Sequence, residues 1–342
     1  MSAPSDTSPA VPAEAPKATA AAASQTRPFY WSVRRELWEN RAVFVAPLAV
    51  AGVILFGGVL GAIAGPHSTT TVRTTRTLVQ SGGASHSETV VIHGVQVEAV
   101  MTPAQRAALA AIPYEFVALA LLVTMFLVAV FYCLGALHNE RRDRSILFWK
   151  SLPVSDLTTV LAKAVVPLAI LPPVALAVTL ATQFGMLLLN TASLAAHGKS
   201  VVDLWTQAPL ASMSLLVLYA LTTLTLWWAP VYAWLMLISG WARRAPFLWA
   251  VLPPLLVAVT EKIAFNTQNV WSLIVYRVMG GFRQAFVIPT QAAMKDGTAF
   301  PNGLPQLDPG KFLSTPGLWI GLALAGAFFA ACVWLRRYRE PI

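Results

Sequence analysis

The chain has 342 residues, of which 56% are hydrophobic and 11% charged, and its mean hydropathy is +0.63. These values lie outside the range of soluble globular domains, so most of the chain is expected to fold in a lipid bilayer. The net charge of +9 is interpreted as a membrane-topology signal, because basic residues that flank hydrophobic spans stay on the cytoplasmic side. It gives no separate indication of a nucleic-acid partner.

The N-terminal 42 residues are predicted to form a tail and a surface helix. Residues 1–26 are rich in Ala, Pro and Ser and lack the apolar centre of a signal peptide, which predicts a disordered cytoplasmic tail. Residues 27–42 predict an amphipathic helix on the cytoplasmic leaflet, with most charges away from its apolar face. The alternative is a soluble helix packed on a partner domain. The residues expected at the membrane interface are Tyr30, Trp31, Val33, Leu37 and Trp38.

Six apolar runs follow, since about 20 helical residues cross a hydrocarbon core of about 30 Å. They cover residues 43–64, 116–137, 164–189, 209–239, 247–262 and 318–335. The fifth run is charge-free only as far as Thr260, and prolines predict irregular third and fourth helices. The segments assigned to the cytoplasm hold 13 Lys or Arg in 49 residues, against 8 in 120 on the opposite side, which places both termini in the cytoplasm.

Two external segments have their own patterns. Residues 65–113 form an insertion in which two stretches rich in Thr and Val flank a Ser-Gly-Gly sequence, which predicts a β-hairpin followed by a short helix from Pro103. Its scattered histidines have no acidic or Cys cluster beside them, so solvated side chains are favoured over a metal site. The sequence of residues 270–279 predicts a short apolar helix in, or re-entering, the outer leaflet.

Both cysteines, Cys133 and Cys332, fall inside spans, so no disulfide is expected in the external loops.

The spans offer little chemistry of their own. With the fifth run ended at Thr260, the six runs contain no Asp, Glu, Lys, Arg or His, which disfavours an ion-coupled carrier. Glu115, Lys163, Glu261 and Lys262 stand at the edges, and snorkelling toward water is the ordinary interpretation. The sequence contains neither a His-Glu-x-x-His motif nor a phosphate-binding loop. Any uphill transport would therefore need energy from another polypeptide, and the chain is not expected to be an enzyme.

The segment between the second and third runs is the most distinctive. Its mixed charges precede a helical face formed by Ile146, Trp149 and Lys150. Pro153 is expected to end this helix and Ser155 to cap the next one. The pattern predicts a short amphipathic element held between two spans on the cytoplasmic side. The alternative is a positive-inside anchor, which does not explain the interleaved acidic residues.

These features resemble the membrane subunits of ABC-2-type ATP-driven exporters. The similarity lies in residues 29–41, 140–150 and 270–279, and in the Ser-Leu-Pro-Val-Ser sequence at 151–155 that is followed by Lys163. The chain departs from the family at Arg144 and Ser145, where a Gly-Thr pair is common, and its external insertion is larger than the family minimum. The fold class that follows is an all-α polytopic membrane protein. It has six transmembrane helices, an N-terminal interfacial helix, a cytoplasmic coupling helix and a small extracytoplasmic β-hairpin insertion.

The resemblance implies a permease subunit in a bacterial-type inner membrane. It would pair with a second permease copy or paralogue and with two copies of a separate ABC ATPase, which would bind ATP and Mg²⁺, while this chain would bind no cofactor or metal. The residues implied to couple the subunits are Glu140, Arg141, Arg142, Asp143, Arg144, Trp149 and Lys150.

The sequence indicates a class of substrate and a set of candidate residues along its path. Apolar spans with aromatic residues suit a hydrophobic or amphipathic substrate, such as a lipid-like molecule, a peptide or an antibiotic. The candidate residues along the path are Thr179, Thr182, Gln183, Thr222, Thr223, Trp227 and Trp228. The competing hypothesis is a non-transporting scaffold or sensor whose external hairpin binds a ligand. Co-isolation with an ATPase distinguishes the two.

Overall fold

The computed structural model describes residues 28–64, 74–77, 87–90, 103–143, 154–196, 198, 201–207, 210–287 and 307–338. Six helices in this part of the chain are long and apolar enough to cross a membrane. They lie at Ala42–Ile63, Ala111–Arg142, Asp156–Ala196, Ala211–Trp241, Pro246–Phe265 and Pro316–Tyr338. The prediction of a helical, multi-pass membrane protein with six such helices is confirmed.

The elements follow one another in a simple order. The N-terminal half contains α2 (Pro28–Glu39), α3 (Ala42–Ala64), β1 (Thr74–Thr77), β2 (Ser87–Val90), α5 (Pro103–Ala136), α6 (His138–Arg142), α8 (Asp156–Val165), the π-helical turn η1 (Val166–Ile170) and α9 (Leu171–Ala196). The second half contains α10 (Val202–Gln207), α11 (Leu210–Trp241), α12 (Pro246–Phe265), α13 (Asn269–Ala285), α15 (Pro309–Ser314) and α16 (Pro316–Tyr338).

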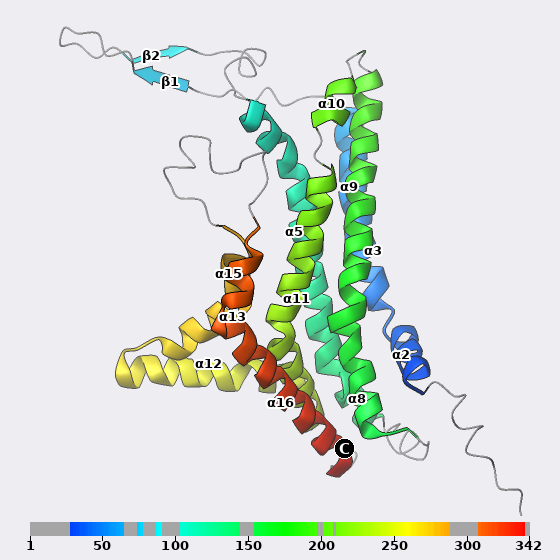
Figure 1. The fold of residues 1–342 in the computed structure, drawn as a ribbon, viewed down its shortest axis with the longest axis vertical. Helices are drawn as coiled ribbons and strands as arrows, with labels where there is room; N and C mark the ends of the chain where they lie inside the picture. The colour runs from blue at the N-terminus through cyan, green and yellow to red at the C-terminus, as the bar shows by residue number, and fades with distance from the viewer. Residues whose placement is uncertain are drawn as a thin grey trace, which may run out of the picture.

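The centre of the bundle is α11, which packs against α5, α13 and α16 (Figure 1). Its inward side contributes the fully buried Trp227, Tyr232 and Met236, which join Met125 of α5 in one hydrophobic core. On the other side of α5, α3 and α9 complete the group of long helices. Many side chains on the outer faces of these helices are apolar and exposed, as expected for helices surrounded by lipid.

The third span is one continuous rod made of α8, η1 and α9. Prolines 167, 172 and 173 lie in or next to its π-helical turn. Proline lacks the backbone N–H that closes an α-helical turn, so a locally wider turn accommodates it. The irregularity predicted for this span is confirmed, and the rod extends beyond both predicted ends.

The second span is longer than expected. A short helix leading into a separate span was predicted, whereas α5 is a single helix of 34 residues that begins at Pro103 and continues through Pro113. Residues 103–113 therefore belong to the same helix as the span.

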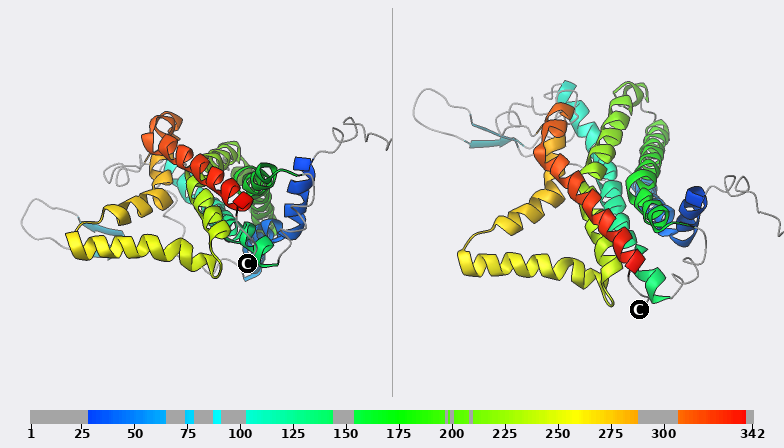
Figure 2. Two further views of the ribbon diagram at one scale, coloured as in Figure 1. Left: turned by 90° about the horizontal axis from the view of Figure 1, so that it is seen from below. Right: turned by 60° about the horizontal axis from the view of Figure 1, so that its bottom comes forward.

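The fifth long helix departs from the direction of its neighbours. It lies across the long axis of the bundle and forms a V with α13, as Figures 1 and 2 show. Ala245, in a left-handed conformation with φ 47°, makes the sharp turn into α12. Only Ala250 and Ala258 of this helix are buried, so nearly all of its apolar surface is open.

The predicted helix at 270–279 is confirmed as a helix and is longer, because α13 runs over 17 residues. Its start is capped by Glu261, whose carboxylate accepts hydrogen bonds from Thr267 Oγ1 (2.6 Å), Asn269 N (2.8 Å) and Val270 N (2.7 Å). Glu261 was interpreted as a snorkelling side chain. It instead fixes the turn between α12 and α13 by satisfying free backbone N–H groups.

The strands β1 and β2 pair antiparallel, with Thr74 opposite Val90 and Thr77 opposite Ser87. The residues that connect them, including the predicted Ser-Gly-Gly turn, lie outside the described residues. The hairpin insertion and its side of the membrane stay predictions.

Candidate functional site

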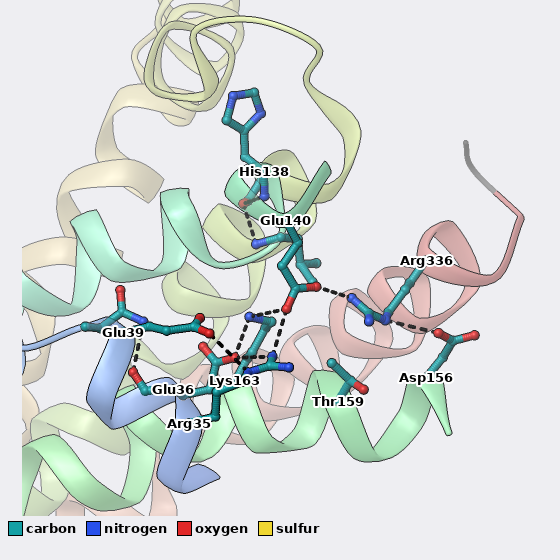
Figure 3. Close-up of polar contacts among 12 residues, drawn as sticks. Arg35, Glu36, Glu39, His138, Glu140, Asp156, Thr159, Lys163 and Arg336 are labelled. Carbon is teal, nitrogen blue, oxygen red and sulfur yellow. Dashed lines mark hydrogen bonds and ion pairs between the residues drawn. The ribbon is translucent and has the colours of Figure 1, made fainter. Parts of the chain in front are cut away.

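A cluster of buried charges lies at one end of the bundle, where α2, α6, α8 and the last turn of α16 meet (Figure 3). We call these residues the ion cluster: Arg35, Glu36, Glu140, Asp156, Lys163 and Arg336.

Lys163 is the centre of the ion cluster. Its Nζ lies 2.7 Å from Glu36 Oε1 and 3.0 Å from Glu140 Oε1. The side chains of Lys163 and Glu36 are each only 2% exposed and that of Glu140 is 7% exposed. Lys163 was predicted to snorkel at the edge of the third span. It is instead an interior residue, because the rod of α8, η1 and α9 begins seven residues before it.

Arg35 completes the pairing from α2. Its Nη2 lies 2.9 Å from both Glu36 Oε1 and Glu140 Oε1, and its Nε lies 3.4 Å from Glu39 at the exposed rim. Burial works against the charge of Arg35, but the hydrogen bond to Glu36 and the neighbouring carboxylates raise its pKa above the ordinary value. Partial burial of Glu39 raises the pKa of that carboxyl.

Arg336 joins the two ends of the predicted coupling segment, residues 140–156 between the second and third spans. Its Nη1 donates to Glu140 Oε2 at 2.5 Å and its Nε donates to Asp156 Oδ1 at 3.0 Å. Glu140 precedes the undescribed residues 144–153 and Asp156 follows them. A single guanidinium on α16 therefore fixes the helix before that segment and the helix after it.

The cluster balances its charges internally. Three carboxylates, of Glu36, Glu140 and Asp156, meet three cations, and Tyr132 donates its hydroxyl to the second oxygen of Glu36 at 3.1 Å. Removing charges from water is costly, and close pairing with satisfied hydrogen bonds offsets that cost. Such a site holds four helix ends in one defined arrangement.

A second set of contacts holds α6 on the end of α11. Ser239 Oγ, fully buried, accepts hydrogen bonds from the backbone N–H groups of Leu137 (3.0 Å) and His138 (2.9 Å). Arg141 Nη1 donates to Gly240 O at 2.6 Å. The chain therefore enters the coupling segment from a position fixed by both α11 and the ion cluster.

The predicted coupling residues divide into three groups. Glu140 and Arg141 are buried and make the contacts described above. Arg142 and Asp143 have exposed side chains and pair with each other at 3.1 Å. Arg144, Trp149 and Lys150 lie outside the described residues. The role of all seven in coupling stays a prediction.

The next helix, α8, begins as the sequence predicted. Ser155 is its N-cap and accepts a hydrogen bond from Thr158 N at 3.1 Å, while Asp156 occupies the first turn. This cap fixes the point at which the chain leaves the coupling segment.

The face of α2 that was predicted to meet the membrane packs in part against the protein. Tyr30, Trp31 and Trp38 are exposed, as an interfacial helix requires, whereas Leu37 packs against the core. The most buried residue of α2 is the charged Glu36. Ion pairing with Lys163 explains its position. The location of α2 at a membrane surface stays a prediction.

The polar residues predicted along a substrate path are mostly engaged within the chain. Thr179, Thr182 and Gln183 are buried on α9. The two threonine hydroxyls donate to carbonyls one turn back, and Gln183 donates to Tyr114 O. On α11, the hydroxyls of Thr222 and Thr223 likewise donate to carbonyls one turn back.

Trp227 and Trp228 serve the packing of α13. Their indole nitrogens donate to the consecutive carbonyls of Arg277 and Val278, each at 3.0 Å. Burial lowers the pKa of the Arg277 guanidinium, which lies over the ring of Trp227 at 4.8 Å. Gly281 lets α13 pack closely against Trp227, because a Cβ at this position would lie 3.0 Å from the Trp227 ring. Whether any of these residues contacts a substrate stays a prediction.

Sequence reasoning missed the ion cluster. Its main contacts join distant parts of the chain: Lys163 and Glu36 are 127 positions apart, and Arg336 and Glu140 are 196 positions apart. One signal was present in the sequence. The acidic and basic residues of the ion cluster all lie in, or just after, the segments that were assigned to the cytoplasmic side. Among the described residues no group of three or more His, Cys, Asp or Glu is placed to hold a metal ion.

No protein-family model, curated protein or solved structure matches this chain. The ion cluster and the helices around it are therefore the basis for a functional assignment.

Proposed function

We propose that the chain is the membrane-spanning subunit of an ATP-driven ABC exporter that moves a hydrophobic or amphipathic substrate. The observation that carries this proposal is the double hydrogen bond of Arg336 to Glu140 and Asp156. A segment fixed at both ends to several long helices transmits force into the bundle when a partner pushes on it. A membrane anchor has no need of such a linkage.

The energy source would be a separate ATPase, since the sequence has no phosphate-binding loop. ATP and Mg²⁺ would bind there. The exposed Arg142 and Asp143 stand where the coupling segment leaves the bundle, so this face is the one offered to that partner. Two ATPase copies and a second permease copy would complete the transporter.

The proposed topology places both termini in the cytoplasm of a bacterial-type cell, with the β1–β2 insertion outside. The ion cluster supports a common side for α2 and the end of α16, because it joins them directly through Glu140. The density of Lys and Arg in the flanking segments supports the cytoplasmic side. The open apolar surface of α12 is available to lipid or to the second permease.

The test is isolation of the tagged full-length chain from its native membrane in a mild detergent. We expect an ABC ATPase, recognised by its phosphate-binding loop, in equal molar amount, together with ATP hydrolysis. Arg142→Glu and Trp149→Ala should each reduce recovery of the ATPase, whereas Arg337→Glu, on the exposed side of the last α16 turn, should not.

Glu140→Gln tests the internal linkage. It should leave the ATPase bound less tightly or uncouple hydrolysis from transport, since Glu140 does not face the partner. If no ATPase is recovered, the scaffold or sensor hypothesis replaces the transporter. If Arg142→Glu and Trp149→Ala both leave complex formation and transport unaltered, the coupling segment is wrongly assigned.

A further inference from the structure

A cavity of about 520 Å³ opens between α5, α9, α11 and α13, far from the ion cluster. Its volume falls in the range typical of small-molecule sites. Most of its wall is aliphatic or aromatic, and Phe116, Leu119 and Leu122 of α5 form one side. Phe282 of α13 also lines the cavity.

Two residues of opposite charge, Glu115 and Arg283, also line this cavity. Glu115 is half-buried and Arg283 is exposed. Within the described residues, neither side chain has a hydrogen bond or an ion pair, either with the other or with a third group. Neither charge is neutralised by a described residue, so a ligand that supplies both counter-charges would fit this wall.

The position of the two charges defines one end of the site. Glu115 precedes Leu137 by 22 residues, about 33 Å along the α5 axis at 1.5 Å per residue, and Leu137 lies beside the ion cluster. That distance is close to the thickness of the hydrocarbon core, about 30 Å. With Leu137 taken as one membrane surface, Glu115 falls at headgroup depth at the other, and Leu119 and Leu122 follow it toward the bilayer centre.

The wall that carries Arg283 is held in place by backbone contacts. Lys311 Nζ, on α15, donates to Arg283 O at 2.8 Å, and Tyr219 of α11 donates its hydroxyl to Ala285 O at 3.0 Å. The end of α13 is thus fixed against α11 and α15, which leaves the Arg283 side chain as the adaptable part of the wall.

We infer that this cavity binds a zwitterionic phospholipid of the phosphatidylethanolamine type, taken from the surrounding membrane. Its phosphate pairs with Arg283, whose planar guanidinium suits phosphate oxygens. Its ammonium group pairs with Glu115, and one acyl chain lies along Phe116, Leu119 and Leu122. A fatty acid would be repelled by Glu115 and a simple amine by Arg283, whereas a zwitterion satisfies both.

This inference goes beyond the proposed function, because binding is measurable in the isolated chain without an ATPase. The experiment titrates the purified full-length protein in maltoside detergent with phosphatidylethanolamine or phosphatidylglycerol of the same acyl chains. Native mass spectrometry measures the fraction of protein with lipid bound. We expect about tenfold tighter binding of phosphatidylethanolamine, the order of one charge-assisted hydrogen bond.

Two charge variants test the headgroup. Glu115→Gln should remove the preference for phosphatidylethanolamine, since the amine loses its partner and the anionic lipid loses a repulsion. Arg283→Gln should weaken both lipids about tenfold. The matched control is Arg243→Gln, an exposed arginine in the turn before α12, which should change neither.

Two steric variants test the acyl site. Leu119→Trp should fill the cavity and abolish binding. Leu127→Trp lies on the same helix with nearly the same exposure, 48% against 49%, and should bind like the wild type. Equal binding of the two lipids by the wild type overturns the inference. So does a retained preference in Glu115→Gln, or equal lipid binding by the two tryptophan variants, which would show adhesion to the lipid-facing surface only.

Discussion

Arg336 Nη1 lies 2.5 Å from Glu140 Oε2, across 196 positions of sequence. The contact connects the last turn of the last helix to the short helix that opens the coupling segment. Because Arg336 also holds Asp156, a displacement of the segment at either end reaches α16, and α16 packs along α11 at the centre of the bundle.

Lys163→Met should strongly destabilise the protein. The substitution leaves the carboxylates of Glu36 and Glu140 buried with fewer cations, and breaking a buried ion pair costs about 3–5 kcal/mol. Thermal unfolding in detergent, followed by tryptophan fluorescence, measures the loss. Lys262→Met, at an exposed position, is the control and should unfold like the wild type.

Combining Lys163→Met with Glu36→Gln tests the same ion pair from the other side. The double variant should lose less unfolding free energy than the two single variants lose together, because Glu36→Gln removes the negative charge that Lys163→Met leaves uncompensated. Strict additivity would mean that the two side chains do not interact.

Arg336→Gln should loosen the coupling segment. Glu140 and Asp156 lose their shared partner, so trypsin should cut at Arg142, Arg144 or Lys150 several times faster than in the wild type. Arg336→Lys should be intermediate, because an ammonium group cannot reproduce the fork of a guanidinium.

The control for this measurement is the adjacent Arg337→Gln, whose side chain is exposed. It should digest at the wild-type rate. Equal rates for Arg336→Gln and Arg337→Gln would show that Arg336 does not restrain the segment.

Replacing glycine by alanine should have opposite effects at two helical positions. At Gly281 a Cβ would meet Leu224 at 2.8 Å and the hydrogen-bonded ring of Trp227 at 3.0 Å, so Gly281→Ala should cost about 1–3 kcal/mol. At Gly326 nothing lies within 4 Å, and Gly326→Ala should gain about 0.5–1 kcal/mol from helix propensity. Unfolding midpoints of the two variants that shift in the same direction would contradict this assignment of contacts.

Both cysteines should be unreactive in the folded protein. Cys133 and Cys332 are free and fully buried, so a maleimide reagent should label them only after denaturation. Cys332 lies one turn before Arg336. In a Cys133→Ala background, Arg336→Gln should therefore make Cys332 reactive without denaturant. A gel-shift assay reports both results, and rapid labelling of the wild type would show that the core around α16 opens readily.

Composition and local signals predicted the parts of this fold that depend on neighbouring residues. The six long helices follow from the length of the apolar runs, the cap at Ser155 from its place before an amphipathic helix, and the irregular third span from its prolines. Each of these features is decided within one or two helical turns, where solvent preference and backbone chemistry act directly.

The ion cluster was beyond such reasoning because it depends on contacts between distant segments. Lys163 and Glu36 each look like ordinary edge residues until α2 and α8 are brought together. The crosswise direction of α12 was equally hidden, since Ala245 sets it through a backbone conformation that alanine rarely adopts. Likewise, Glu261 was recognisable as a cap only once the turn after α12 was known.

The π-helical turn between α8 and α9 sets the rotational phase of one half of the rod against the other. Each residue of an α-helix advances the side chains by about 100° around the axis, and a π turn arises when one residue is added to that count. If Val166–Ile170 kept its five residues but wound as a regular α-helix, α8 would be rotated relative to α9 and Lys163 would turn away from Glu36. The wider turn is therefore as necessary to this ion pair as the lysine that it orients.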